Sequence, residues 1–179
     1  MTGQMPLELR PAVTVRPLDA AADLPAVRAM VDRCSPRALR HRFLATGIGV
    51  CESYLDTITR DKAQHTEVAT RAETILGIGS LLPMRRRGAE VCLLVDDGWH
   101  GRGVGSAIAV RLGVRAAARG ITHVKAHVLV GNRSAHTLIS RLCPGARAGP
   151  PDAGVVVYDV PVGRLGLLTA GRPIAADDF

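Results

Sequence analysis

The sequence has few aromatic residues and no long apolar run. Only 3% of its 179 residues are Phe, Tyr or Trp, so few rings are present to stack on bases, which counts against recognition of single-stranded nucleic acid. Arg, Gly or Pro interrupts every apolar stretch well before 18 residues, and the N-terminal residues lack the pattern of a signal peptide. We therefore expect a cytoplasmic protein without membrane partners.

Cysteine is also scarce, and its spacing excludes two classes of site. The sequence has no CxxC pair and no dense cysteine spacing, so it predicts neither a metal centre nor a disulfide framework. We expect reduced and mostly buried thiols. The four cysteines are Cys34, Cys51, Cys92 and Cys143.

The charge is basic but does not identify a partner. The net charge is +7, and 21 of the 23 basic residues are Arg, a bias that matches genomic base composition and to which we attach no function. Such a charge suits an anionic ligand, nucleic acid or a solvated surface. The run Arg85–Arg87 before Gly88 is typical of an exposed hairpin tip, so we do not expect nucleic acid as the partner.

The length fits one compact domain. We expect this domain over residues 13–162, with loosely held tails over 1–12 and 163–179.

The first half of the domain has the pattern of a strand, three helices and an antiparallel meander. Alternation predicts a strand over 13–17, and Asp19 or Asp23 caps the helix that follows. Ser35 before a proline begins a second helix, and a short third helix is predicted over 52–59. β-Branched and aliphatic residues then predict strands over 66–71, 74–82 and 89–95.

The second half alternates helices with strands. A helix is predicted over 103–119, with Gly120 as a left-handed cap. One face has an apolar stripe that includes Ile108, and Arg111 and Arg115 are expected to face water. A strand over 122–130, a helix over 132–142 and a strand over 155–160 follow. This α/β order makes the strands on either side of the 103–119 helix parallel.

The most informative segment is the glycine-rich turn VDDGWHGRGVGS at 95–106, which joins a strand to a helix. Glycines at 101, 103 and 105 let the backbone approach an anion closely. The free amides and the dipole of the first helical turn then attract negative charge. The segment therefore predicts a pyrophosphate site.

Two other phosphate motifs fit this turn poorly. A P-loop needs GxxxxGK followed by Ser or Thr, and the turn has no lysine. A dinucleotide fingerprint needs a third glycine where Ser106 stands, and it opens a βαβ unit instead of following a meander.

The same residues resemble the GNAT (Gcn5-related N-acetyltransferase) superfamily. Its acetyl-CoA signature is Gln or Arg, two residues, Gly, one residue, then Gly or Ala, and here it reads HGRGVG from His100 to Gly105. His100 replaces the usual Gln or Arg and can still donate to a phosphate. The resemblance covers about residues 13–162 and includes the NxxA-like start of the next helix, Asn132–Ala135.

The resemblance implies a single GNAT-like α/β domain with a mixed, mostly antiparallel sheet, flanking helices and a splayed parallel strand pair. Acetyl-CoA would then lie between the splayed strands, with its pantetheine paired to one strand like an extra strand. The implied acetyl-CoA contacts are Leu93, Leu94, Val95, His100, Gly101, Arg102, Gly103, Val104, Gly105, Ser106 and Asn132. Among them, the amide at about Leu94 would bind the thioester carbonyl.

Transfer to an amine requires removal of a proton, because a protonated amine has no lone pair. Glu90 is the first candidate base, since it begins the strand that leads to the turn and stands among apolar neighbours that can raise its pKa. Its surroundings, together with Ser35 through Phe43, resemble bacterial protein lysine acetyltransferases, which carry a glutamate there. An alternative is a solvated glutamate at a strand start. Weaker candidates are Asp96, Asp97, His127 and His136.

The family's usual tyrosine acid is replaced by Ile139, so Ser140 or water would have to reprotonate the thiolate. The sequence thus predicts an acetyl-CoA-dependent N-acetyltransferase for a protein lysine, an N-terminus or a small amine. A non-catalytic acyl-CoA-binding regulatory module is the alternative, and a nucleic-acid-binding domain is the third. The acceptor is not encoded in any readable motif, and a homodimer stays open because many relatives are dimers.

Overall fold

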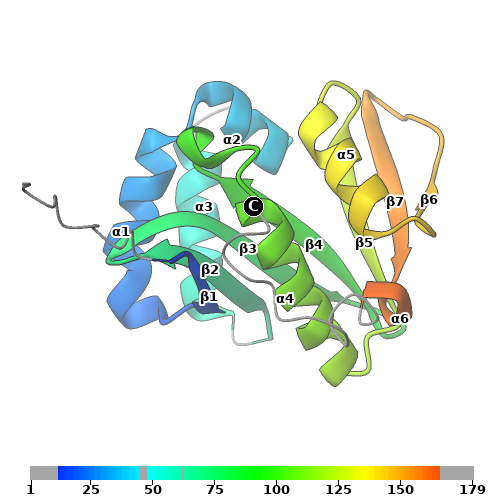
Figure 1. Ribbon diagram of the computed structural model, residues 1–179, viewed down its shortest axis with the longest axis horizontal. Coiled ribbons are helices and arrows are strands. Elements are labelled where there is room, and N and C mark those ends of the chain that lie inside the picture. The colour runs from blue at the N-terminus through cyan, green and yellow to red at the C-terminus, as the bar shows by residue number, and fades with distance from the viewer. Residues whose placement is uncertain (1–11, 45–47, 62, 166–179) are drawn as a thin grey trace, which may run out of the picture.

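The computed structural model describes residues 12–44, 48–61 and 63–165. Almost all of the two tails expected from the sequence lies outside the described residues. Figure 1 shows the arrangement of the helices and strands. In chain order they are β1 (Thr14–Pro17), α1 (Ala20–Arg33), α2 (Pro36–Phe43), α3 (Ile48–Arg60), β2 (His65–Arg71), β3 (Thr74–Met84), β4 (Gly88–Val95), a 3-10 turn (Asp97–Trp99), α4 (Val104–Ala118), β5 (His123–Leu129), α5 (Arg133–Leu142), β6 (Arg147–Ala148), β7 (Val155–Pro161) and α6 (Val162–Leu165).

The strands form one mixed sheet in the order β1-β2-β3-β4-β5-β7-β6. Strands β1 to β4 make the antiparallel meander that the sequence predicts. Strands β4 and β5, on either side of α4, are parallel as expected, and β5 pairs antiparallel with β7. The predicted α/β class and mixed sheet are therefore confirmed. The short strand β6 and helix α6 were not predicted, because neither has enough residues to show a period.

Local capping explains where several helices begin and end. The Ser35 hydroxyl accepts from the Ala38 amide at 3.2 Å, as expected for a cap before a proline. Asp19 caps α1 through the amides of Ala21 and Ala22. Gly120 has a φ of 68° just after α4, which confirms the predicted left-handed position.

Two apolar clusters hold helices on opposite faces of the sheet. One joins α4 and the end of α5 to the sheet through Ile108, Leu112 and Cys143. The other joins α1, α2 and α3 to the opposite face through Met30, Leu55 and Ile78. Figure 1 shows α4 in front of the central strands and α1 and α3 on the far side. Helices therefore cover both faces of the sheet. Strands β4 and β5 stop pairing after Glu90–Lys125.

Helix α4 is also fixed to the sheet by charge. Glu67 is fully buried on β2, and its carboxylate accepts from Arg115 Nε at 3.1 Å and lies 2.9 Å from His65 Nε2. Arg111 Nε approaches the second oxygen to 3.9 Å. The prediction that both arginines simply face water is thus wrong, because a buried carboxylate needs a counter-charge and long side chains can reach it while staying partly exposed.

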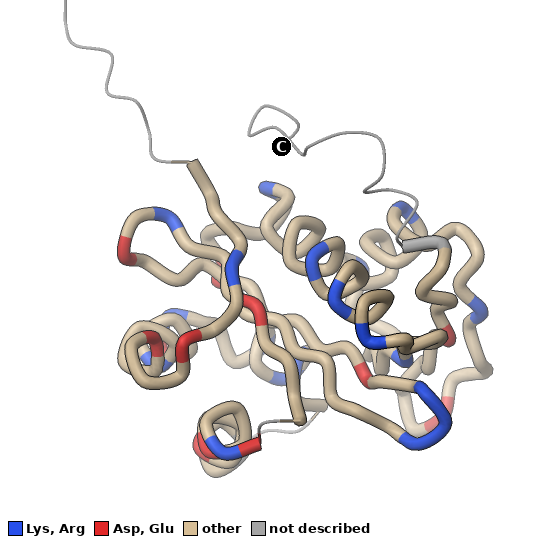
Figure 2. The backbone as a smooth tube through the Cα atoms, turned by 90° about the horizontal axis from the view of Figure 1, so that it is seen from below, with Lys and Arg blue, Asp and Glu red and all other residues tan. Residues whose placement is uncertain are grey.

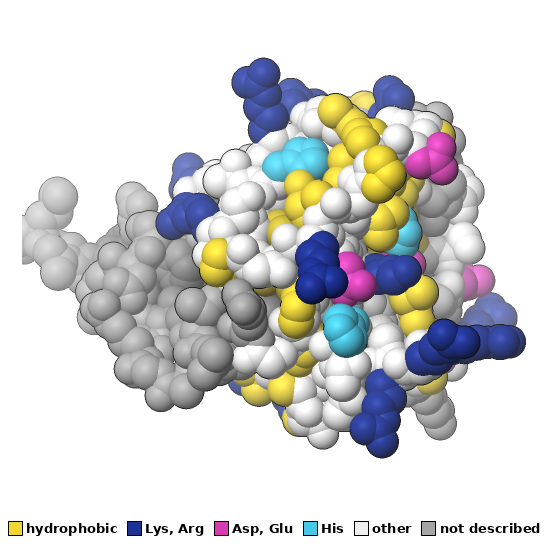
Figure 3. Space-filling view, turned by 90° about the vertical axis from the view of Figure 1, so that its right-hand side faces the viewer, with side chains coloured by type: hydrophobic (Ala, Val, Ile, Leu, Met, Phe, Trp, Pro, Cys, Tyr) yellow, Lys and Arg dark blue, Asp and Glu magenta, His cyan; other side chains and the backbone are white. Residues whose placement is uncertain are grey.

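The basic residues of the described part of the chain include one exposed turn and several dispersed positions. The Arg85–Arg87 turn is exposed between β3 and β4, as predicted, and Figure 2 shows this basic turn at a corner of the molecule. On the face shown in Figure 3, basic side chains are dispersed among apolar and acidic ones. No helix in the described part of the chain is long and apolar enough to cross a membrane.

Close packing between α4 and β3 requires glycine at position 79. A Cβ on Gly79 would lie 2.4 Å from a methyl of Ile108 and 2.6 Å from one of Leu93. We predict that Gly79→Ala lowers the free energy of unfolding by about 1–3 kcal/mol through overpacking. Urea denaturation measures this change. Gly131→Ala is the matched control, because its new Cβ would meet no atom within 4 Å, and equal losses in both variants would contradict the packing argument.

Candidate active site

The site begins where the two central strands separate. Strands β4 and β5 pair only from Gly88–His123 to Glu90–Lys125. Beyond that register β4 continues to Val95 and β5 to Leu129 without pairing to each other. The splayed parallel pair that the resemblance implies is therefore present, and a cleft opens between the strands.

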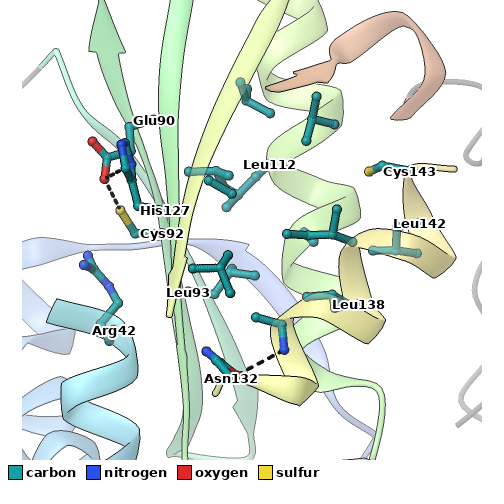
Figure 4. A pocket seen from close by; sticks show the side chains of 18 of the residues that line it. Arg42, Glu90, Cys92, Leu93, Leu112, His127, Asn132, Leu138, Leu142 and Cys143 are labelled. Carbon is teal, nitrogen blue, oxygen red and sulfur yellow. Dashed lines mark hydrogen bonds and ion pairs between the residues drawn. The ribbon is translucent and has the colours of Figure 1, made fainter. Parts of the chain in front are cut away.

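The cleft has an apolar side and a polar side, which Figure 4 shows on opposite sides of the strands. On the side of α4 and α5 it is lined by Leu112, Leu138, Ile139 and Leu142. On the side of α2 it is lined by Arg42, Glu90, Cys92 and His127. A flexible apolar chain thus fits one side, while groups that carry charge or protons lie on the other.

Strand β4 presents alternate backbone groups to the gap. The Asp96 amide donates to the Leu76 carbonyl at 2.9 Å, and the register between β3 and β4 is regular. Because hydrogen-bonded and non-hydrogen-bonded pairs alternate, the backbone of Leu94 faces β3, and the backbones of Leu93 and Val95 face the gap. The expectation that the Leu94 amide donates to a thioester in the gap is thus wrong, because this amide faces β3. The amide of Leu93 faces the gap instead.

The glycine-rich turn has the conformation expected of an anion site. Gly101 and Gly103 have φ values of 71° and 75°, which only glycine adopts readily, and Gly103 is the N-cap of α4. No side chain among the described residues caps this helix. The amides of Val104, Gly105 and Ser106 are therefore available at the positive end of the helix dipole.

His100 contacts the end of β4 in this turn, and its predicted contact with a phosphate stays a prediction. Its Nε2 lies 2.9 Å from the Val95 carbonyl oxygen, and because a carbonyl only accepts, Nε2 donates. His100 thus connects the turn to the end of β4. The guanidinium of Arg102 lies 5.3 Å from the Trp99 ring and is one of the cations near the turn.

Glu90 lies at the point of separation, next to His127. Its Oε1 is 3.4 Å from His127 Nδ1 and 3.6 Å from the Cys92 sulfur. The side chains of Glu90 and His127 are 34% and 32% exposed, so both can exchange protons with solvent. The sequence named His127 only as a weaker candidate, because its distance from Glu90 in the chain hides their contact across two strands.

Cys92 is not poised as a nucleophile. Burial raises the pKa of its thiol to about 11, so the thiolate is rare at neutral pH. All four cysteines are free, with Cys34 and Cys143 buried and Cys51 and Cys92 half-buried.

The other titratable candidates have structural partners. Asp96 accepts from Arg33 Nε at 2.8 Å, and Asp97 accepts from the amide and hydroxyl of Ser35. His136 lies 2.8 Å from the Tyr158 hydroxyl and 3.1 Å from the Leu129 carbonyl oxygen. None of these three side chains lines the cleft, whereas His127 does. Of the titratable candidates that the sequence names, Glu90 and His127 are thus the two that line the cleft.

The structure places Ile139, which stands at the position expected for a general acid, in the lining of the cleft. The resemblance implies a tyrosine at this position. Ser140, by contrast, is exposed and lies outside the lining of the cleft. Ser140 is therefore a poor substitute, and of the two groups expected to reprotonate a thiolate, water fits the geometry.

Asn132 has the double position that the sequence predicts. Its Oδ1 accepts from the Ala135 amide at 3.2 Å and so caps α5, while the residue also lines the cleft. Because the cap uses only the oxygen, the side-chain NH₂ stays available as a donor.

Comparison with known proteins agrees with this geometry. Residues 27–143 match the Acetyltransferase (GNAT) family, and no curated protein matches the sequence. Among solved structures, the GNAT domain of S. lividans PAT superposes with a TM-score of 0.74 at 22% identity, over 83% of this chain and 90% of that one.

Two further solved structures share the fold. The PaiA N-acetyltransferase from Thermoplasma acidophilum, in complex with coenzyme A, has a TM-score of 0.66 at 14% identity, over 84% of this chain and 99% of that one. The ribosomal-protein-S18-alanine N-acetyltransferase from Escherichia coli has a TM-score of 0.65 at 16% identity, over 84% and 94%. With its splayed strands, its uncapped glycine turn and a family match over well over half of its length, the chain belongs to the GNAT family of acetyltransferases.

Proposed function

We propose that this cleft binds acetyl-CoA and transfers its acetyl group directly to an amine, with Glu90 as the base. The observation that carries the proposal is the convergence of two features on one gap: unpaired backbone groups of β4 and an uncapped helix start. Each suits a different part of one ligand, an extended chain and a diphosphate respectively.

The turn would hold the pyrophosphate. The amides of Val104, Gly105 and Ser106 would donate to it, and the positive φ values at Gly101 and Gly103 shape the approach. Arg102 is exposed and adds positive charge nearby. The Val104 side chain is itself buried in the core, so this residue would contribute only its backbone.

The pantetheine would lie along the gap against β4. The backbone groups of Leu93 and Val95 would pair with it, and the free NH₂ of Asn132 would donate from the other strand's end. The Val95 carbonyl already accepts from His100, which leaves the Val95 amide as the group for the ligand. The Leu93 amide, nearest to Glu90 along the gap, would donate to the thioester oxygen as that oxygen gains negative charge.

The amine would approach from the polar side of the cleft. Glu90 accepts its proton, the amine nitrogen attacks the thioester carbon, and the carbon–sulfur bond breaks to give the amide and a thiolate. His127, 3.4 Å from Glu90, would pass the proton on to solvent. Water would reprotonate the thiolate, since a thiol with a pKa of about 8.5 is a tolerable leaving group.

The acceptors that we propose are a protein lysine, a protein N-terminus or a small amine. Two of the similar structures are an N-acetyltransferase that acts on the alanine of a ribosomal protein and the GNAT domain of PAT. A single assay of CoA release with an amine panel tests the proposal. Tight CoA binding without turnover of any amine would instead favour the non-catalytic binding module.

Replacement of Gly105 by glutamate separates anion binding from helix stability. A Cβ at Gly105 would make only ordinary contacts, at 3.7 Å to Val95 and 3.9 Å to Leu138. A carboxylate in the first helical turn favours the helix dipole but repels a diphosphate. We expect Gly105→Glu to weaken CoA binding about tenfold to hundredfold, by calorimetry, without lowering the Tm.

Ala117→Glu is the matched control for that test, because it adds the same charge at an exposed position near the other end of α4. Both variants carry the same net charge, and only Gly105→Glu should weaken CoA binding. Equal affinity in the two variants would show that the turn does not hold the diphosphate.

Removal of the base should slow chemistry without affecting cofactor binding. We expect Glu90→Gln to lower kcat/KM by about a hundredfold or more at neutral pH, with partial recovery at high pH, where the amine is itself neutral. Steady-state kinetics across pH, with CoA affinity measured in parallel, checks this. Glu73→Gln, at an exposed turn between β2 and β3, is the control, and full activity of the Glu90 variant would exclude it as the base.

Direct transfer also predicts that Cys92 is dispensable. Although its sulfur lies 3.6 Å from Glu90, the high pKa of the thiol disfavours an acetyl-cysteine intermediate. We expect Cys92→Ala to keep kcat within about threefold of the wild type, since it removes no reacting group. Loss of turnover, or acetylated Cys92 in the mass spectrum of quenched wild-type enzyme, would argue for a covalent route.

A further inference from the structure

Arg42 stands out among the cleft residues because its charge has no counter-ion in the described structure. It lies in the last turn of α2 and lines the polar side of the cleft. Its Nε is inaccessible to solvent and has no hydrogen-bond partner among the described residues. None of the ion pairs in this part of the chain includes it. A buried donor on a charged group without a partner is costly, so an anionic partner would be favourable there.

Aromatic rings hold the Arg42 side chain in place of an anion. The guanidinium carbon lies 4.5 Å from the Tyr54 ring centroid and 4.9 Å from that of Phe43. The Tyr54 hydroxyl is itself fixed by Ser80 Oγ at 3.1 Å. Both rings contact the guanidinium, and no hydrogen bond among the described residues uses its two terminal nitrogens. These nitrogens are left as donors for a planar anion such as a carboxylate. The head group is therefore preorganised rather than merely exposed.

The charges of Arg42 and Glu90 face the same space. Figure 4 shows Cys92 between them, and both charges act on the Cys92 thiol, Arg42 to lower its pKa and Glu90 to raise it, although burial dominates. An acceptor in this space meets a carboxylate at one end and a guanidinium at the other. A zwitterion matches that pattern, while a second cation on the acceptor would be repelled by Arg42.

We propose that Arg42 is a specificity-determining residue that selects acceptors carrying a carboxylate in addition to the amine to be acetylated, and that it disfavours polyamines. This inference rests on the proposed acetyl transfer, and it narrows the acceptor from any amine to an amino acid or an acidic peptide segment. In the complex, the amine faces Glu90 and the acceptor carboxylate receives two donors from the Arg42 fork.

The experiment uses pairs of acceptors that share one amine and differ in one carboxylate. In both pairs the acceptor amine is the ε-amine of lysine. The single-residue pair is Nα-acetyl-lysine and Nα-acetyl-lysinamide, and the peptide pair is Ac-Lys-Glu-NH₂ and Ac-Lys-Gln-NH₂. We expect wild-type kcat/KM to favour the acid over its amide about tenfold or more in at least one pair, and to be lower still for spermidine. In Arg42→Gln the preference should disappear, mainly by loss of rate on the acid.

Arg40→Gln is the matched control, because Arg40 is exposed on the same helix and its loss should leave the preference unchanged. Thermal unfolding and CoA affinity show whether each variant is folded and loaded. Equal rates on acid and amide in the wild type, or an unchanged preference in Arg42→Gln, would overturn the role of Arg42 while leaving acetyl transfer intact.

Failure of acetyl transfer itself gives a different result. If the wild type turns over none of the amines, the proposed function is wrong, and calorimetric binding of each acid and amide to the CoA-loaded protein then tests Arg42 independently. Tighter binding of the acid that is lost in Arg42→Gln supports the inference, and equal binding of acid and amide overturns it.

Discussion

The separation of β4 and β5 after three paired residues is the constraint on which the site depends. Backbone amides and carbonyls inside a protein require partners, and the outer half of β4 has lost the neighbour that would supply them on one side. An extended ligand with its own amides restores the missing partners, which is why a long, flexible cofactor suits this gap better than a compact one. The same divergence exposes Glu90, because its strand neighbour moves away immediately beyond it.

Helix α4 turns this gap into a cofactor site, and its position is determined by packing and charge together. Gly79 allows the helix to lie close to β3, with Ile108 and Leu112 against the strand backbone. Glu67 attracts Arg111 and Arg115 from the same helix and sets its rotation. The helix start is thereby aimed at the end of β4, so the anion-binding amides and the unpaired strand edge serve one ligand.

The polar side of the cleft carries charged groups of both signs. Glu90 and His127 lie 3.4 Å apart, where we propose that they carry a proton, and the positive charge of Arg42 contacts two aromatic rings. Between them the Cys92 thiol stays neutral because it is buried. An acceptor is thus met by fixed charges of both signs, and acceptor choice in such a site depends on where the acceptor carries its own charges. Family membership leaves that choice open, since function resides in the site rather than in the fold.

The sequence determined those features that depend on residues close together in the chain. The Ser35 cap, the Gly120 cap, the strand periods and the glycine turn are local, and their interactions form within a few residues. Tertiary structure alone decided what depends on contacts between distant segments: Arg111 and Arg115 reach Glu67, Leu94 faces β3 while Leu93 faces the gap, and His100 binds the end of β4. Tertiary structure also decided that Arg42, Glu90 and His127 line one cleft, since they come from α2, β4 and β5. The sequence pattern within each element does not show which side chains converge when a helix and two strands pack together.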